Sequence, residues 1–228
     1  MLVKWKAAQE QEQEAWEDIG TGTPIDSPQE WRDFLGKRFC IDFGVFHAKS
    51  VLEIGCGPLG IIHFIEPDHG LRVGVDSLLF TYEKHDNFHR IRAIGEFLPL
   101  RGEFEVVVCF NVLDHCLLPR MLLREAALHA RTGGVLLLWV HTTRKAVRFL
   151  VKRIDRYHPH HFSMEEVRHM VSEAGFGIRA LWASPAGYEI NEPSFNLREF
   201  IRILRTKSIK TAIYSLIKTD TCLVCMKP

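Results

Sequence analysis

The chain has 228 residues, of which 46% are hydrophobic and 25% are charged. This balance is typical of a folded globular protein and excludes an intrinsically disordered chain. The 29 Lys and Arg residues nearly cancel the 28 Asp and Glu residues, which leaves a formal net charge of +1. We therefore expect no binding to DNA, and we disfavour RNA as a partner, because no excess of positive charge covers the whole chain.

No apolar run of signal-peptide or membrane-spanning length occurs in the sequence. We therefore expect a cytoplasmic protein with reduced cysteines. Cys222 and Cys225 form a C-x-x-C pattern, but the pattern lacks a second pair and lies in an apolar run. These features favour buried structural thiols over a zinc site.

Residues 1–46 are predicted to form a helical region, since aromatic residues recur among acidic ones, with an interruption near residues 20–24. We expect this region to cover a ligand cleft as a lid, or to form the surface of a homodimer. Residues 47–228 are predicted to form one domain with a helical insertion at about residues 185–219.

Short apolar runs alternate with stretches of helical length along this domain. The runs predict strands at residues 51–54, 71–75, 104–109, 135–140, 177–183 and 221–227. The helices are expected at residues 59–66, 78–90, 119–131, 163–174, 197–205 and 207–217. Such alternation predicts an α/β fold, with a doubly wound parallel sheet covered by helices on both faces.

Capping residues support two of these helices. Pro119 suits a helix start, and the pair Gly133 and Gly134 suits the stop of the same helix. Ser163 and Glu166 have the spacing of a capping box, which predicts a helix start at this point.

The first strand leads directly into the glycine-rich sequence Gly55-Cys56-Gly57-Pro58-Leu59-Gly60. Glycine allows a ligand to lie against the backbone there, facing the amides of the helix that follows. Asp76 ends the second strand and is placed to accept hydrogen bonds from two ribose hydroxyls. The pattern indicates a nucleotide-like ligand.

Glu53 helps to distinguish among such ligands. A carboxylate two residues before the first glycine suits a cationic amino acid and a sulfonium, but it repels a pyrophosphate. An NAD-dependent oxidoreductase remains an alternative, although the sequence offers no residues for hydride transfer.

These motifs resemble those of the class I S-adenosylmethionine-dependent methyltransferases. Within them the chain is similar to the small-molecule group of the ubiquinone and menaquinone biosynthesis methylases (methyltransferase type 11). The resemblance covers about residues 48–183 and the last strand, and it rests on residues 51–57, 75–76, 96–100, 104–108 and 111–115. It implies a Rossmann-like sheet of seven mostly parallel strands with an antiparallel last strand. It also implies S-adenosylmethionine as cofactor and methyl transfer to a small molecule.

The resemblance also implies which residues bind the cofactor. They are Glu53, Gly55, Cys56, Gly57, Pro58, Asp76, Ser77, Leu78, Glu96, Phe97, Asn111 and Val112. By this likeness the glycine turn lines the methionine part and Glu53 holds its ammonium. Asp76 holds the ribose, Ser77 and Leu78 border adenine, and Asn111 and Val112 lie beneath the sulfonium.

Two positions depart from the family's pattern. Leu59 stands where a third glycine is usual, and Ile94 stands where many relatives have an aspartate that binds the adenine amine. Glu96 or backbone groups would then have to bind adenine. The departures leave open a non-catalytic protein that keeps the fold to bind a partner.

Methyl transfer depends mainly on alignment and exclusion of water, but a hydroxyl acceptor also needs a base. The candidates are His115, His160 and His161, each with a structural role as the alternative. The run that begins at His158 raises the possibility of a metal site, but its proline and the lack of a nearby carboxylate set lead us to predict no metal.

Two basic segments, residues 144–156 and 198–218, are expected to flank the acceptor pocket. Their arginines would suit a phosphate, a carboxylate or a nucleotide-linked sugar, unless they are simply solvated helix faces. Apolar residues between the charges would also suit peripheral contact with a membrane. No motif specifies the acceptor, so that methylation of either an O or an N atom is expected.

Overall fold

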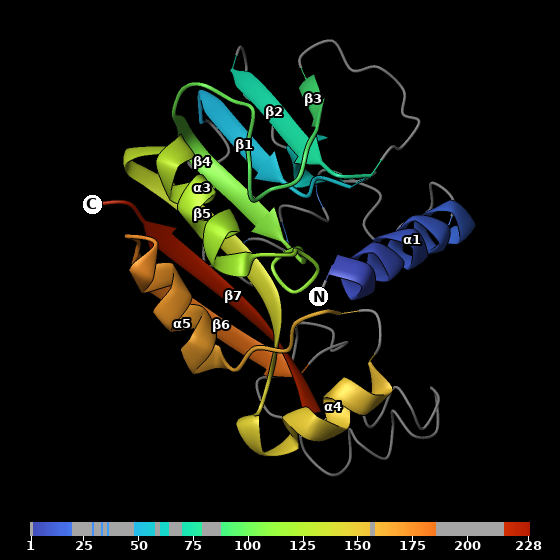
Figure 1. The fold of residues 1–228 in the computed structure, drawn as a ribbon. Helices are drawn as coiled ribbons and strands as arrows, with labels where there is room; N and C mark the ends of the chain where they lie inside the picture. The colour runs from blue at the N-terminus through green and yellow to red at the C-terminus, as the bar shows by residue number, and fades with distance from the viewer. Residues whose placement is uncertain are drawn as a thin grey trace.

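The computed structural model describes residues 2–19, 29, 33, 36, 48–57, 60–63, 70–78, 88–155, 158–185 and 217–228. Its main element is a seven-stranded sheet (Figure 1). The strands are β1 Ser50–Ile54, β2 Leu71–Asp76, β3 Phe88–Arg92, β4 Phe104–Phe110, β5 Ala130–Thr143, β6 Gly177–Pro185 and β7 Lys218–Met226. The described helices are α1 Leu2–Ile19, η2 Ile61–His63, α3 Pro119–His129, η3 Lys145–Val147, α4 Arg148–Ile154 and α5 Met164–Glu173.

The strands lie in the order β3-β2-β1-β4-β5-β7-β6. Strands β1 to β5 pair in parallel, whereas β7 is antiparallel to both β5 and β6. The predicted Rossmann-like fold with an antiparallel last strand is therefore confirmed. The strand order reverses between β1 and β4, and ligands of such sheets bind in the crevice at the carboxyl ends of these strands.

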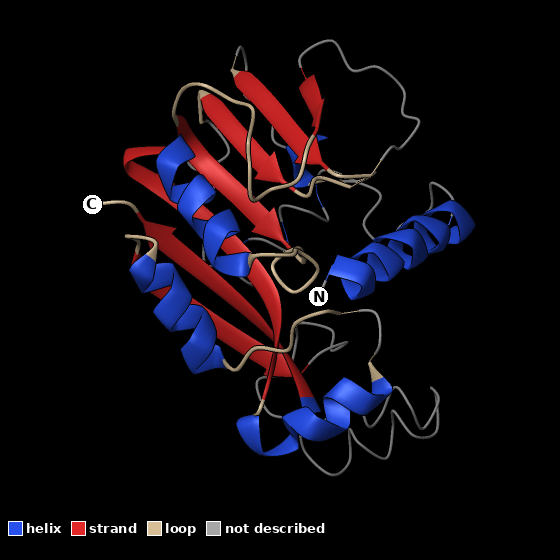
Figure 2. Ribbon diagram, viewed as in Figure 1, coloured by secondary structure: helices blue, strands red, loops and turns tan. Residues whose placement is uncertain are grey.

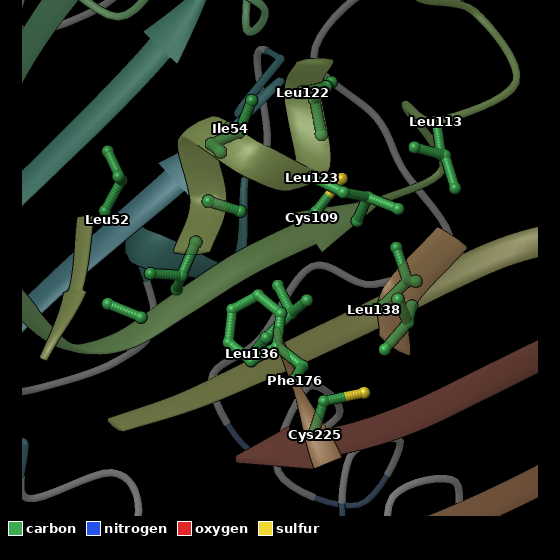
Figure 3. Close-up of a cluster of buried hydrophobic side chains, with 14 of the residues drawn as sticks. Leu52, Ile54, Cys109, Leu113, Leu122, Leu123, Leu136, Leu138, Phe176 and Cys225 are labelled. Atoms are coloured by element: carbon green, nitrogen blue, oxygen red, sulfur yellow. The ribbon is translucent and has the colours of Figure 1, made fainter. Parts of the chain in front are cut away.

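Hydrophobic side chains bury both faces of the central strands, which explains the continuous apolar runs in the sequence. Leu52, Cys109 and Leu138 belong to the cluster in Figure 3, together with Leu122 and Leu123 of α3. Figure 2 shows α3 and α5 on this face of the sheet. A second buried cluster on β1 and β4 includes both isoleucines of η2.

Three boundary predictions have clear outcomes. The range 78–90 was expected to be helical, but Phe88–Arg92 forms β3, because this segment pairs in parallel with β2. The helix that starts at Pro119 ends at His129, and the Gly133 amide donates to the carbonyl of Lys227 instead of ending the helix. The capping box of Ser163 and Glu166 is confirmed at the start of α5.

Several predictions lie outside the described residues. Among them are Pro58, Leu59, the two helices expected at residues 197–205 and 207–217, and the basic side chains they carry. The division of the chain at residue 46 stays a prediction. Among the described helices, none combines the length and the apolar character needed to cross a membrane.

Candidate functional site

The turn after β1 requires glycine at its first position. Gly55 has a φ of 75°, and a Cβ atom there would lie 2.0 Å from Cγ2 of Val112. Its amide donates to the carbonyl of Val75 at 2.7 Å, which ties the turn to β2. Cys56 between the glycines is buried, and burial raises the pKa of its thiol, so that this side chain fills space and stays protonated.

Asp76 lies beside this turn at the end of β2. Its Oδ2 accepts a hydrogen bond of 2.8 Å from the Gly57 amide, and its Oδ1 accepts one of 2.9 Å from the Leu78 amide. Burial raises the pKa of Asp76, while these two bonds act in the opposite direction. Each carboxylate oxygen can accept a further bond, so that Asp76 can also bind ligand hydroxyls.

Glu53 supports the same turn from within the domain. Its carboxylate accepts hydrogen bonds from the amides of Ile61 at 3.2 Å and Ile62 at 3.0 Å. Burial raises the pKa of Glu53 to about 8. A Cβ at position 60 would lie 2.4 Å from Glu53 Oε2, which explains Gly60. Glu53 does not line the pocket described next, and its contact with a cofactor ammonium stays a prediction.

A cavity of about 130 Å³ lies at the carboxyl ends of β1, β2 and β4. It is lined by the glycine turn, Asp76, Ser77, Leu78, Ile94, Glu96, Asn111, Val112 and His115, and by Trp5, Gln9 and Glu12 of α1. Helix α1 lies beside the arrowheads of β1 and β4 in Figure 1. Ligand sites usually enclose about 300–1,000 Å³, so this cavity is smaller than most.

The backbone at Asn111 adopts a left-handed conformation, with a φ of 54°. Its amide donates to the Trp139 carbonyl at 2.8 Å, which fixes the turn after β4. The side-chain Oδ1 is buried and has no hydrogen-bond partner among the described residues. An unsatisfied buried oxygen on a cavity wall is suited to a ligand that brings a donor.

Glu96 and Phe97 have different surroundings. Oε1 of Glu96 accepts hydrogen bonds from the amides of Leu117 at 2.6 Å and Leu118 at 3.0 Å, just before α3. Glu96 therefore holds the loop before α3 while it also lines the cavity. Phe97 is 57% exposed and does not line the cavity.

Of the three predicted catalytic histidines, His115 lines the cavity. Both of its ring nitrogens are buried without a hydrogen-bond partner within the described part of the chain, and Glu12 Oε2 lies 3.7 Å from Nδ1. Burial lowers its pKa, although Asp114 acts in the opposite direction. This imidazole is therefore available to a bound molecule.

His160 and His161 have structural contacts instead. Nε2 of His160 lies 3.0 Å from the Cys116 carbonyl oxygen, and the ring stacks on Phe162. His161 Nδ1 lies 3.8 Å from Asp155, and burial lowers the pKa of His161 to about 4. Neither residue lines the cavity, and a catalytic role for either stays a prediction.

His158 belongs to the same histidine run as His160 and His161, which were selected from it as candidates, but His158 is the member that contacts His115. Its ring centroid lies 4.4 Å from that of His115, and its Nδ1 lies 2.8 Å from Asp155 Oδ1. Lys218 Nζ lies 2.6 Å from Asp155 Oδ2. The i,i+3 spacing of Asp155 and His158 was the signal in the sequence that could have indicated this pair.

The first basic segment is partly paired within the fold. Lys145 Nζ lies 2.8 Å from Glu165, and Arg148 Nη1 donates to Glu166 at 3.0 Å. These contacts tie η3 and α4 to the start of α5 and favour the structural interpretation of these two side chains. Lys152 and Arg153 are exposed.

Comparisons with known proteins agree with this geometry. The sequence profile of the family described as "Methyltransferase domain" matches residues 27–181, whereas the comparison with curated proteins gives no match. A candidate sarcosine dimethylglycine methyltransferase from Galdieria sulphuraria is similar in fold, with a TM-score of 0.64 and 14% identity over 92% of this chain and 93% of that one. A candidate methyltransferase from Bacillus halodurans has a TM-score of 0.58 and 16% identity over 78% and 92%.

A third similar structure is a Haemonchus contortus phosphoethanolamine N-methyltransferase in complex with phosphomonomethylethanolamine and S-adenosylhomocysteine. Its TM-score is 0.52, with 15% identity over 78% of this chain and 48% of that one. At these identities the likeness concerns the fold. The family profile, in contrast, spans more than half of the chain. The chain therefore belongs to the methyltransferase domain family and is an S-adenosylmethionine-dependent methyltransferase.

Proposed function

We propose that the chain transfers a methyl group to an O or N atom of a small acceptor, anionic or sugar-like, that binds beside His115. The observation that carries this proposal is the position of His115. Its two ring nitrogens are buried without hydrogen-bond partners among the described residues, and the ring lines the same cavity as Asn111 and Val112. An acceptor atom next to this imidazole would lie close to the cofactor, as in-line transfer requires.

The residues of the cavity suit S-adenosylmethionine, whose sulfonium supplies the methyl group. Asp76 offers carboxylate oxygens to the ribose, and the orphaned Oδ1 of Asn111 suits a donor of the ligand. Gly55 and Gly57 line the cavity where the methionine part would lie, and Gly55 packs so closely on Val112 of the same wall that a side chain there would collide with it. Helix α1 would act as the lid that excludes water during transfer.

Two observations support an anionic acceptor. The Haemonchus contortus neighbour is bound to phosphomonomethylethanolamine, a small molecule with a phosphate group. The exposed side chains of Lys152 and Arg153 on α4 are available to an anionic group. Methyl transfer to a small acceptor is also compatible with peripheral contact of the protein with a membrane and with a homodimer formed through α1.

The test begins with calorimetric titration of S-adenosylmethionine and S-adenosylhomocysteine, with NADH as the control ligand. Phosphorylated alcohols, sugars, carboxylates and amines are then offered as acceptors, and release of S-adenosylhomocysteine is measured. Cofactor binding with turnover of at least one small anionic or sugar-like acceptor supports the proposal. Absence of binding of either sulfur ligand, or turnover only with macromolecules, would overturn it.

A further inference from the structure

Three side chains that could hold a metal ion converge next to the cavity. Asp114 and His115 lie in the loop after β4, and His158 lies between α4 and α5. One ligand-type atom from each residue lies within 4.8 Å of those from the other two. His115 also lines the cofactor cavity, so that this cluster is at the acceptor side of the site.

The atoms in this cluster lack the hydrogen bonds that buried polar groups normally make. Asp114 is 1% exposed and His115 is 8% exposed. Within the described part of the chain, Asp114 Oδ1 and both ring nitrogens of His115 have no hydrogen-bond partner. Asp114 Oδ1 and one of the two nitrogens of a neutral His115 ring offer lone pairs of the kind that divalent metal ions bind.

The third residue has the support that metal-binding histidines usually have. Asp155 Oδ1 lies 2.8 Å from His158 Nδ1, which orients the ring, and His158 Nε2 lies 3.8 Å from Asp114 Oδ2. A carboxylate on one imidazole nitrogen leaves the other nitrogen as the ligand and fixes its direction. Lys218 holds the second oxygen of Asp155 at 2.6 Å.

The charges of this region also favour a cation. Three carboxylates, those of Asp114, Asp155 and Asp220, are at most 3% exposed. Among the described residues, Lys218 is the one lysine or arginine that is equally buried. A divalent ion would offset the remaining negative charge.

We propose that Asp114, His115 and His158 bind a divalent transition-metal ion that holds the oxygen of the methyl acceptor. This differs from the prediction of no metal, because the fold brings Asp114 from the loop after β4 next to His158, which their distance along the chain does not show. Two imidazoles and one carboxylate suit ions such as Zn²⁺ and Mn²⁺ better than Mg²⁺ or Ca²⁺, and they leave coordination positions open. The proposal rests on the proposed function and narrows it to oxygen acceptors. The ion would favour the deprotonated hydroxyl, whose proton passes to water before the C–O bond forms and the S–CH₃ bond breaks.

The experiment uses the full chain, free of affinity tags and stripped with EDTA. Zn²⁺, Mn²⁺ and Mg²⁺ are titrated by calorimetry, and Co²⁺ is added to record its visible absorption, which reports the coordination geometry. Binding of one ion per chain is expected, with Mg²⁺ the weakest. The variants Asp114→Asn, His115→Gln and His158→Gln should each lose the Co²⁺ spectrum and weaken Zn²⁺ binding by at least about 10-fold.

Two further variants sharpen this test. Asp155→Asn should weaken binding of the ion by about 10- to 100-fold, because Asp155 acts through His158. At high Co²⁺ concentration this variant should still show the Co²⁺ spectrum. His169→Gln is the matched control, since the His169 side chain is 66% exposed on α5. Circular dichroism and melting curves establish which variants fold. Any two folded variants among the three ligand positions are enough to test the metal site.

Binding of S-adenosylhomocysteine to the same samples separates this proposal from the proposed function. If the stripped wild-type chain binds S-adenosylhomocysteine but no transition-metal ion, the metal site is wrong and the histidines act as imidazoles. Equal ion binding in the wild type and the folded ligand variants would also overturn it. Ion binding without any binding of the sulfur ligands would instead overturn the proposed function.

Discussion

Asp76 Oδ2 accepts a hydrogen bond of 2.8 Å from the backbone amide of Gly57. This bond joins the end of β2 to the turn after β1, although the two residues are 19 positions apart. The carboxylate therefore shapes the turn and faces the cavity at the same time. Removal of its charge should affect cofactor binding by both routes.

The variant Asp76→Ala should weaken binding of S-adenosylhomocysteine by about 10- to 100-fold, since a hydrogen bond to a charged group contributes roughly 1.5–3 kcal/mol. Asp76→Asn should lie between this variant and the wild type. Calorimetry provides the measurement. Glu103→Gln is the control, because Glu103 lies at the amino end of β4, away from the carboxyl ends where the cavity lies. Equal losses in both variants would contradict the assignment of Asp76.

Alanine variants of Gly55 and Gly133 separate the cost of a left-handed backbone from the cost of a collision with the cavity wall. Their φ values are 75° and 74°, but a Cβ atom would meet Val112 at 2.0 Å in the first case and nothing within 4 Å in the second. Gly133→Ala should therefore lose only about 1–2 kcal/mol from the left-handed backbone. Gly55→Ala should lose more stability and also cofactor binding.

Thermal melting and titration with S-adenosylhomocysteine distinguish the two glycine variants. A loss of about 1 kcal/mol lowers the melting temperature of a chain of this size by roughly 2–4 °C. Equal melting temperatures and equal affinities for the two alanine variants would refute the steric role of Val112 at Gly55.

Glu53 should make the free energy of unfolding depend on pH. Burial raises its pKa from 4.5 to about 8, so that the folded state binds the proton more tightly than the unfolded state. Stability from this group is present below about pH 4.5 and is lost as the pH rises toward 8. Urea unfolding of the wild type and Glu53→Gln should show that the variant gains relative stability across this range. A constant difference between them would rule out the raised pKa.

Helix α1 should control how fast the cofactor enters and leaves. Ser77 Oγ donates a hydrogen bond of 2.6 Å to Gln9 Oε1, which ties α1 to the residue after β2. Gln9→Ala should raise both the association and the dissociation rate of S-adenosylhomocysteine by about 2- to 10-fold, as expected for loss of one hydrogen bond. Stopped-flow fluorescence measures both rates. Gln11→Ala, an exposed glutamine of the same helix, should leave them unchanged, and identical rates in the two variants would argue against a lid.

The sequence was sufficient to predict the positions of Gly55 and Asp76 at the carboxyl ends of two strands, because these positions depend on local patterns. Short apolar runs lead to Gly55 and Asp76 and favour buried strands, and the carboxyl ends of parallel strands meet at one edge. Strand β3 was missed because its pairing with β2, rather than its own composition, decides its conformation. Such tertiary pairing cannot be recognised from a window of a few residues.

The histidine cluster was also beyond sequence reasoning. His158 lies 43 positions after His115, and their contact depends on how the segment after α4 returns below the loop after β4. The amide of His160 bonds to the Asp114 carbonyl at 3.3 Å and helps to fix this return. The sequence placed three histidines within one short run, whereas the structure pairs one of them with residues from another loop.

The position of β7 has a consequence for the synthesis of the protein. Residues 218–226 are made after the other six strands, yet they lie between β5 and β6 in the sheet. Among the strands that the structure describes, β5 lacks a neighbour on one side and β6 lacks a partner until these residues leave the ribosome. Exposed edges of this kind favour aggregation, so that insertion of β7 is the step that removes this hazard from the folding sheet.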